Sequence, residues 1–116
     1  MPPCEATVRQ ADSVIIIYLK GSMTLAGGIG TLRQQVKAAV AAGQKKVLVN
    51  LKELSYLDSA GMGELVSACS TLRNLGGDLR LVSPQDRVRN LLNMTKLSDI
   101  FVVFFNEQVA LHSFTT

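Results

Sequence analysis

The chain has 116 residues, which suits one compact domain, predicted to span residues 1–116. Hydrophobic residues make up 47% of it, which is enough for a sizeable core and too many for a disordered chain. The net charge of +3 is modest and the Lys and Arg residues are scattered, so the sequence predicts no nucleic-acid partner.

The sequence predicts neither a membrane anchor nor an export signal. Its longest apolar runs, residues 14–19 and 100–105, are far shorter than the roughly 20 residues that cross a bilayer. The two cysteines, Cys4 and Cys69, lack the spacing of a metal site or a disulfide framework, and Cys69 is expected in the core. We therefore expect a cytoplasmic protein without membrane insertion, metal or cofactor.

The first half of the chain predicts a strand pair, a helix and a further strand. Residues 14–19 are continuously apolar, as in a strand covered on both faces, and residues 6–10 are a candidate partner strand. Helical spacing follows from Ile29, and Gly43 ends this helix. Residues 47–51 then form a second buried strand.

The second half continues the alternation. A short connection, residues 52–57, leads to a helix whose apolar face is formed by Met62, Leu65, Val66, Cys69 and Leu72. Residues 79–82 are the third strand. Ser83 is expected to cap the next helix, with Pro84 at its first position. A last strand at residues 101–105 precedes a terminal helix that opens at Asn106. Strands alternating with helices indicate an α/β layer structure, parallel where helices join the strands.

The segment Asp58-Ser59-Ala60-Gly61-Met62-Gly63 opens the helix that follows the second buried strand. Asp58 or Ser59 could cap the helix, which is worth about 1 kcal/mol. Each glycine costs about as much inside a helix. The glycines therefore indicate either close packing of this helix start or a surface on which another molecule approaches the backbone.

An enzymatic role has little support in the sequence. Position 57 is leucine where the hydrolase elbow has glycine, and the single histidine, His112, is expected to be an exposed residue of the terminal helix. The glycine cluster at residues 27–30 has no phosphate-loop lysine, and Arg33 stands where a dinucleotide fingerprint has a small residue, so we interpret the cluster as a flexible loop.

A phosphate on Ser59 would lie near the unpaired N–H groups and the positive end of the helix dipole. The fold could carry the phosphate without rearrangement, and the added charge of about −1.5 to −2 would weaken the binding of a partner that docks there.

The stretches "VLVNLKELSYLDSAGMGELV", "NLGGDLRLVSPQDRVRNLLNMTKLSDIF" and "FNEQVAL" resemble the STAS domain of bacterial anti-anti-sigma factors, also called anti-sigma factor antagonists. The similarity covers about residues 8–111. It implies an α/β, STAS-like fold: a mixed sheet of about five strands with a mostly parallel centre, an antiparallel N-terminal strand and about four helices.

The resemblance also implies a mechanism. In such proteins the serine after the aspartate, here Ser59 beside Asp58, is phosphorylated by a serine kinase that is itself the anti-sigma factor. The unphosphorylated form binds this kinase and releases a sigma factor, and a phosphatase of the PP2C type restores it. Besides Asp58 and Ser59, the expected partner-binding residues are Ala60, Gly61, Met62, Gly63, Thr24 and Ser22.

One position departs from the family pattern. Thr24 stands where many members carry an acid near the serine. This favours an alternative in which the chain is a constitutive STAS subunit of a signalling scaffold or a membrane transport complex, without phosphorylation. A nucleotide-binding or nucleotide-hydrolysing enzyme is a third, weakly supported hypothesis.

Overall fold

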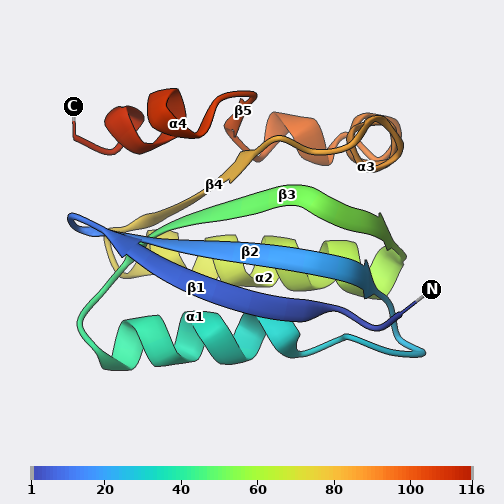
Figure 1. Cartoon of the computed structure of the whole chain (residues 1–116), viewed down its shortest axis with the longest axis horizontal. Coiled ribbons are helices and arrows are strands. Elements are labelled where there is room, and N and C mark those ends of the chain that lie inside the picture. Colours follow the sequence, from blue (N-terminus) through green and yellow to red (C-terminus); the bar gives the residue numbers. More distant parts are fainter. Residues whose placement is uncertain (1, 116) are drawn as a thin grey trace.

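The computed structural model describes residues 2–115, which form a five-stranded sheet and four α-helices (Figure 1). The strands are β1 (Glu5–Ala11), β2 (Val14–Met23), β3 (Lys46–Leu57), β4 (Asp78–Val82) and β5 (Val103–Phe104). The helices are α1 (Thr31–Ala41), α2 (Ser59–Asn74), α3 (Asp86–Met94) and α4 (Glu107–Ser113), with a 3-10 turn, η1, at Leu97–Asp99.

The strands lie in the order β1-β2-β3-β4-β5. β1 is antiparallel to β2, and every other neighbouring pair is parallel. Each parallel pair is joined through a helix, as α/β connections require. The predicted mixed sheet with an antiparallel N-terminal strand is confirmed.

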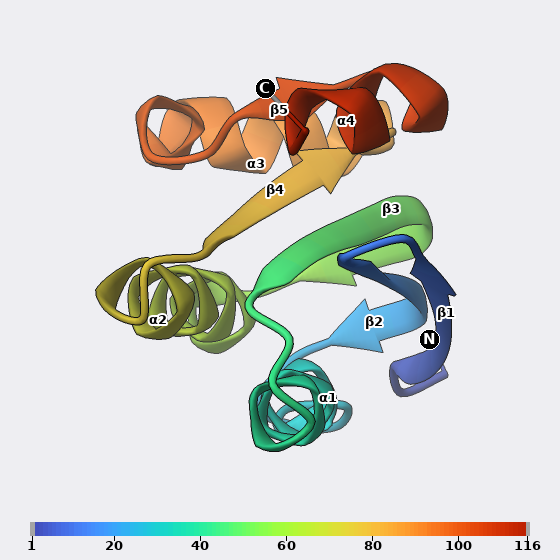
Figure 2. The same cartoon turned by 90° about the vertical axis from the view of Figure 1, so that its left-hand side faces the viewer.

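Successive side chains of β2 supply two different cores, which explains its continuous hydrophobicity. Ile15 and Ile17 belong to the core covered by α1 and α2, whereas Ile16 packs with Ala110 and Phe114 at α4. Figure 2 shows α1 and α2 next to each other on the same side of the sheet. The start of α2 therefore lies beside α1 and the loop that precedes it.

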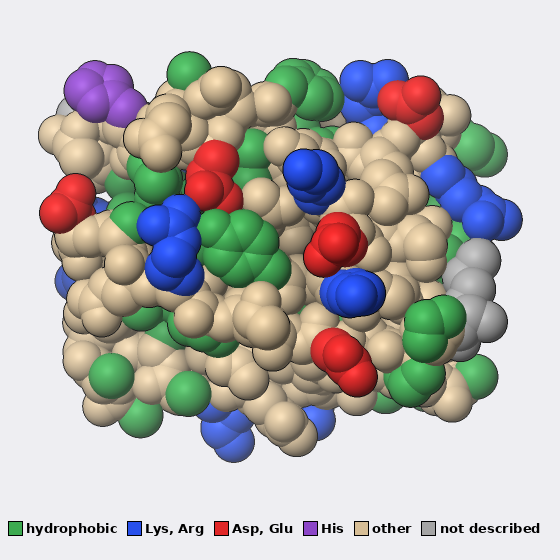
Figure 3. All heavy atoms as spheres, in the orientation of Figure 1, with side chains coloured by type: hydrophobic (Ala, Val, Ile, Leu, Met, Phe, Trp, Pro, Cys, Tyr) green, Lys and Arg blue, Asp and Glu red, His purple; other side chains and the backbone are tan. Residues whose placement is uncertain are grey.

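Charged side chains of both signs alternate on the side of the molecule drawn in Figure 3. Opposite charges also face each other in the strand register, where Glu5 lies opposite Lys20, and Lys20 lies opposite Glu53. This side of the molecule therefore has no basic stripe of the kind that binds nucleic-acid phosphates.

Several boundaries differ from the sequence-based prediction. The last strand, expected at residues 101–105, is limited to Val103–Phe104. Residues 52–57 are not a connection: β3 continues to Leu57 beside β2, with register shifts in the pairing. Ser83 is not a helix cap, because it has a positive φ of 57° and the N-cap of α3 is Gln85. Asn106 is the N-cap of α4, as predicted, and its side chain accepts the N–H of Val109 at 3.0 Å.

The glycine cluster at residues 27–30 has a packing role that the interpretation as a flexible loop missed. Gly28 has a φ of 87°, and a Cβ there would lie 2.7 Å from the backbone N of Cys4 and overlap the carbonyl oxygen of Ser22. A side chain would therefore displace the N-terminal residues that pack against this turn. The cluster therefore packs closely where the chain passes between β1, β2 and α1.

Candidate functional site

Asp58 holds the start of α2 in place. It is the N-cap residue, and its Oδ1 accepts the N–H of Gly61 at 3.0 Å. Its Oδ2 accepts the N–H of Leu25, in the loop between β2 and α1, also at 3.0 Å. Of the two predicted capping candidates, Asp58 is the cap, which leaves the hydroxyl of Ser59 free of that task.

The same hydrogen bonds keep the Asp58 carboxylate ionised. The N–H of Leu25 and then that of Gly61 stabilise the charged form and hold the pKa of Asp58 below its ordinary value. An ionised carboxylate at a helix N-terminus also interacts favourably with the helix dipole. The site therefore carries one negative charge before any modification.

Ser59 is exposed at the first position of α2. Its hydroxyl makes no hydrogen bond to any of the residues 2–115 that the structure describes. A modifying enzyme could reach this oxygen without unfolding the helix.

The two glycines of the motif have different surroundings. A Cβ on Gly61 would overlap the carbonyl oxygen of Met23 and lie 2.9 Å from Cβ of Leu57. A Cβ on Gly63 would meet nothing within 4 Å, and this residue is exposed. Close packing therefore explains Gly61, and only Gly63 is open to the approach of another molecule.

Glu64 is a structural residue that sequence reasoning missed. Its Oε1 accepts the N–H of Gly30 at 2.6 Å and its Oε2 accepts the N–H of Arg33 at 2.9 Å. Gly30 is the N-cap of α1 and supplies no side-chain cap, so a carboxylate from α2 performs this role. The carboxylates of Asp58 and Glu64 thus accept hydrogen bonds from both ends of the loop between β2 and α1, and hold this loop against the first turns of α2.

The structure brings most, but not all, of the predicted partner-binding residues to the surface beside Ser59. Thr24 lies in the loop fastened by Asp58, and its Oγ1 donates to the carbonyl oxygen of Gly27 at 3.2 Å. Ser22 is only 5% exposed and donates its hydroxyl to the carbonyl oxygen of Pro2, so it does not join this surface.

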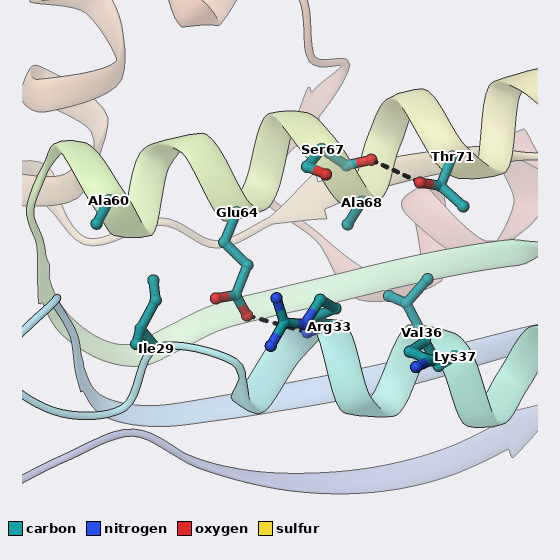
Figure 4. Close-up of a pocket in the computed structure, with 9 residues that line it drawn as sticks. All are labelled: Ile29, Arg33, Val36, Lys37, Ala60, Glu64, Ser67, Ala68 and Thr71. Atoms are coloured by element: carbon teal, nitrogen blue, oxygen red, sulfur yellow. Dashed lines mark hydrogen bonds between the residues drawn. The ribbon is translucent and has the colours of Figure 1, made fainter.

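Two grooves flank Ser59. One, of about 410 Å³, is lined by Ser59, Met62, Gly63, Val66, Ser67, Thr95 and Leu97. The other, of about 430 Å³, lies between α1 and α2 and includes Ala60 (Figure 4). Four of the eight predicted residues line these grooves: Ser59, Met62 and Gly63 line the first, and Ala60 lines the second.

Residues 2–115 contain no group of three or more His, Cys, Asp and Glu side chains that could hold a metal ion. No helix among them is long and apolar enough to cross a membrane. His112 is exposed on α4, whereas Ser59 begins α2, and the two lie toward opposite ends of the molecule (Figures 1 and 3). The structure does not assemble a serine nucleophile with a histidine base.

Comparison with known proteins gives the family. The protein-family model described as "STAS domain" matches residues 5–110 of this chain. The chain belongs to the STAS domain family. This STAS chain is 27% identical over 99 residues to the "Anti-sigma F factor antagonist" of Paenibacillus polymyxa, with 84% of each protein covered. Relatives of this kind are binding modules, so the STAS chain is not an enzyme.

Solved structures show the same fold. An anti-sigma factor antagonist from Mycobacterium paratuberculosis has a TM-score of 0.85 at 20% identity, and the match covers 97% of this chain and 95% of that one. The Bacillus cell fate determinant SpoIIAA in its phosphorylated form has a TM-score of 0.72 at 19% identity, with 94% and 98% covered.

Proposed function

We propose that this STAS chain, as a single domain of residues 1–116, is an anti-sigma factor antagonist switched by phosphorylation of Ser59. In its unphosphorylated form it binds an anti-sigma factor that is a serine kinase, and a sigma factor is released in the cytoplasm. A phosphatase of the PP2C type reverses the modification. The exposed, unbonded hydroxyl of Ser59 at a preformed helix start carries this proposal.

Apolar groups around Ser59 support a protein partner. Leu25, whose N–H donates to Asp58, is 75% exposed. Met62, Val66 and Leu97 line the groove that includes Ser59. Clusters of exposed apolar side chains on a soluble domain are typical of interaction sites. In the unphosphorylated form a partner can cover these groups and Ser59 together.

Phosphorylation would then act through charge. The phosphate adds about −1.5 to −2 charges beside the Asp58 carboxylate, which is already ionised. A partner that covers this surface would have to desolvate both charges. A penalty of about 3 to 4 kcal/mol would change a nanomolar complex into a roughly micromolar one.

The direct test compares variants of one helix. Ser59→Asp should weaken binding to the anti-sigma factor at least about tenfold, whereas Ser59→Ala should leave it largely intact. Ser70→Asp, at an exposed position further along α2, is the matched control because it adds the same charge to the same helix. Equal affinities for the two Ser59 variants would reject the switch.

The modification itself is tested by incubation with ATP and the candidate kinases of the same genome. Mass spectrometry should locate the phosphate on Ser59 in the wild-type protein and find none in Ser59→Ala. Thr24 favours the constitutive STAS subunit as a second candidate function. That alternative would be supported if the protein copurified with scaffold or transporter subunits and carried no phosphoserine.

A further inference from the structure

The groove between α1 and α2 begins at Ala60, the residue after Ser59, and runs along both helices. Figure 4 shows its two walls, with Arg33, Val36 and Lys37 on α1 and Ala60, Ser67 and Thr71 among the residues on α2. The α2 wall is low because most of its side chains are small. Its floor is apolar, since Val36 and Ala68 are buried between the helices.

The rim on α1 is positively charged. Arg33 and Lys37 are exposed, and no carboxylate of the described residues lies within ion-pair distance of either side chain. The one carboxylate that lines the groove, that of Glu64, accepts backbone N–H groups with both oxygens. The dashed line to Arg33 in Figure 4 marks such a bond to its backbone N–H. The two cations are therefore available to an acidic partner.

The shape of the groove favours an elongated occupant over a small molecule. It runs from Ala60 to Thr71, which at 1.5 Å per helical residue is about 16 Å, or three turns of a helix. Arg33, Lys37, Ser67 and Thr71 are all exposed, so a small molecule would stay largely in water. Small-molecule pockets usually bury most of the ligand surface.

We infer that this groove binds an acidic amphipathic helix of a protein partner. Apolar side chains of that helix contact Ile29, which lines the groove and is 39% exposed, above the floor formed by Val36 and Ala68. Its carboxylates pair with Arg33 and Lys37. Recognition of an amphipathic helix by an apolar groove is a common mode of binding, and charge complementarity along the rim sets its orientation. Ser59 does not line this groove, although it precedes Ala60 at one end of it, whereas Arg33 and Lys37 lie on the opposite wall.

The test uses a designed peptide of about 18 residues, long enough to be partly helical, with leucines at helical spacing flanked by glutamates. Titration into the isotopically labelled protein should shift the amide resonances of residues 60–71 and 33–37. A second peptide with lysine in place of each glutamate should not bind. Binding of both peptides alike, or shifts located elsewhere, would overturn the inference.

Matched variants separate charge recognition from general effects. The double variant Arg33→Gln, Lys37→Gln should raise the Kd of the acidic peptide about fivefold or more. The control Lys20→Gln, Lys52→Gln removes the same charge from exposed strand residues and should leave the Kd unchanged. Equal effects of the two double variants would contradict the proposed rim contacts.

The same titration distinguishes a peptide helix from a small-molecule occupant, and this inference from the proposed switch at Ser59. If dodecanoate shifts the groove resonances and the acidic peptide does not, the site takes a small amphipathic anion and the helix proposal is wrong. Ser59→Ala, which cannot be phosphorylated and adds no charge, should bind the acidic peptide with wild-type affinity because Ser59 does not line this groove. Failure of the Ser59 switch with normal peptide binding would therefore reject only the proposed function, and the reverse result would reject only this inference.

Discussion

Replacing each glycine of the α2 start by alanine should shift stability in opposite directions. In Gly61→Ala the new methyl group would overlap the carbonyl oxygen of Met23, which belongs to β2 and cannot rotate away. In Gly63→Ala the methyl group would point into open space. Because both residues lie in α2, two positions apart, the helix-forming gain of alanine is similar in the two variants.

The size of the difference follows from two opposing terms. Alanine in place of glycine stabilises a helix by up to about 1 kcal/mol. Overpacking typically costs about 1 to 3 kcal/mol, and a clash with backbone should lie near the upper end. Gly61→Ala should therefore destabilise the protein by about 2 kcal/mol, whereas Gly63→Ala should stabilise it by up to about 1 kcal/mol.

Urea unfolding followed by circular dichroism would measure both free energies. At about 4 °C per kcal/mol for a domain of this size, the two melting temperatures should differ by roughly 12 °C. If Gly61→Ala were as stable as the wild type, the close approach of α2 to β2 would be wrong. Gly63→Ala adds a second readout, because it should weaken binding of the anti-sigma factor while the fold is stabilised.

Glu64→Gln should destabilise the fold by about 1 to 2 kcal/mol, because the carboxamide keeps only one acceptor oxygen for the two amides. Hydrogen exchange at the Gly30 and Arg33 amides should become faster, and unchanged exchange would contradict the capping of α1 by Glu64. The pKa of Asp58 is lower in the folded protein than in the unfolded chain, so the ionised carboxylate stabilises the fold. This contribution to the free energy of unfolding is complete above the ordinary aspartate pKa of about 3.9 and is lost as pH falls through the lower folded value. Urea unfolding at pH 5 and at about pH 3 should thus show that the wild type loses more unfolding free energy between the two pH values than Asp58→Asn does. Equal losses in the two proteins would refute this role of Asp58. Burial raises the pKa of Cys4 to about 11, so iodoacetamide should alkylate it at the rate of unfolding, and fast labelling of the native protein would argue against its burial.

Much of the fold could be predicted from the sequence because its hydrophobic periods are regular. The continuous run at residues 14–19 and the helical spacing after Met62 correspond to β2 and α2. The second half of β3 was missed for a physical reason. Leu51, Leu54 and Leu57 are all fully buried but lie three residues apart, and a strand produces that spacing only where its pairing shifts register, as it does here.

The site was predictable only where its chemistry is local. Asp58 and Ser59 are adjacent, so the capping role and the free hydroxyl could both be considered from the motif. Glu64 binds amides 34 and 31 residues away, and no local pattern indicates such a contact. Burial of Ser22 likewise depends on the N-terminal residues folding back across β2.

The hydrogen bonds of Asp58 have a consequence for how the cell's ionic conditions would affect this protein. They fix the backbone around Ser59 before any kinase acts, so a phosphate would change the charge at this position and leave the backbone in place. The field of such a charge fades over about 8 Å in 0.15 M salt and about 3 Å in 1 M salt. Raising the salt concentration should therefore weaken the long-range effect of a phosphate on Ser59, whereas the cost of desolvating that phosphate under a docked partner should remain.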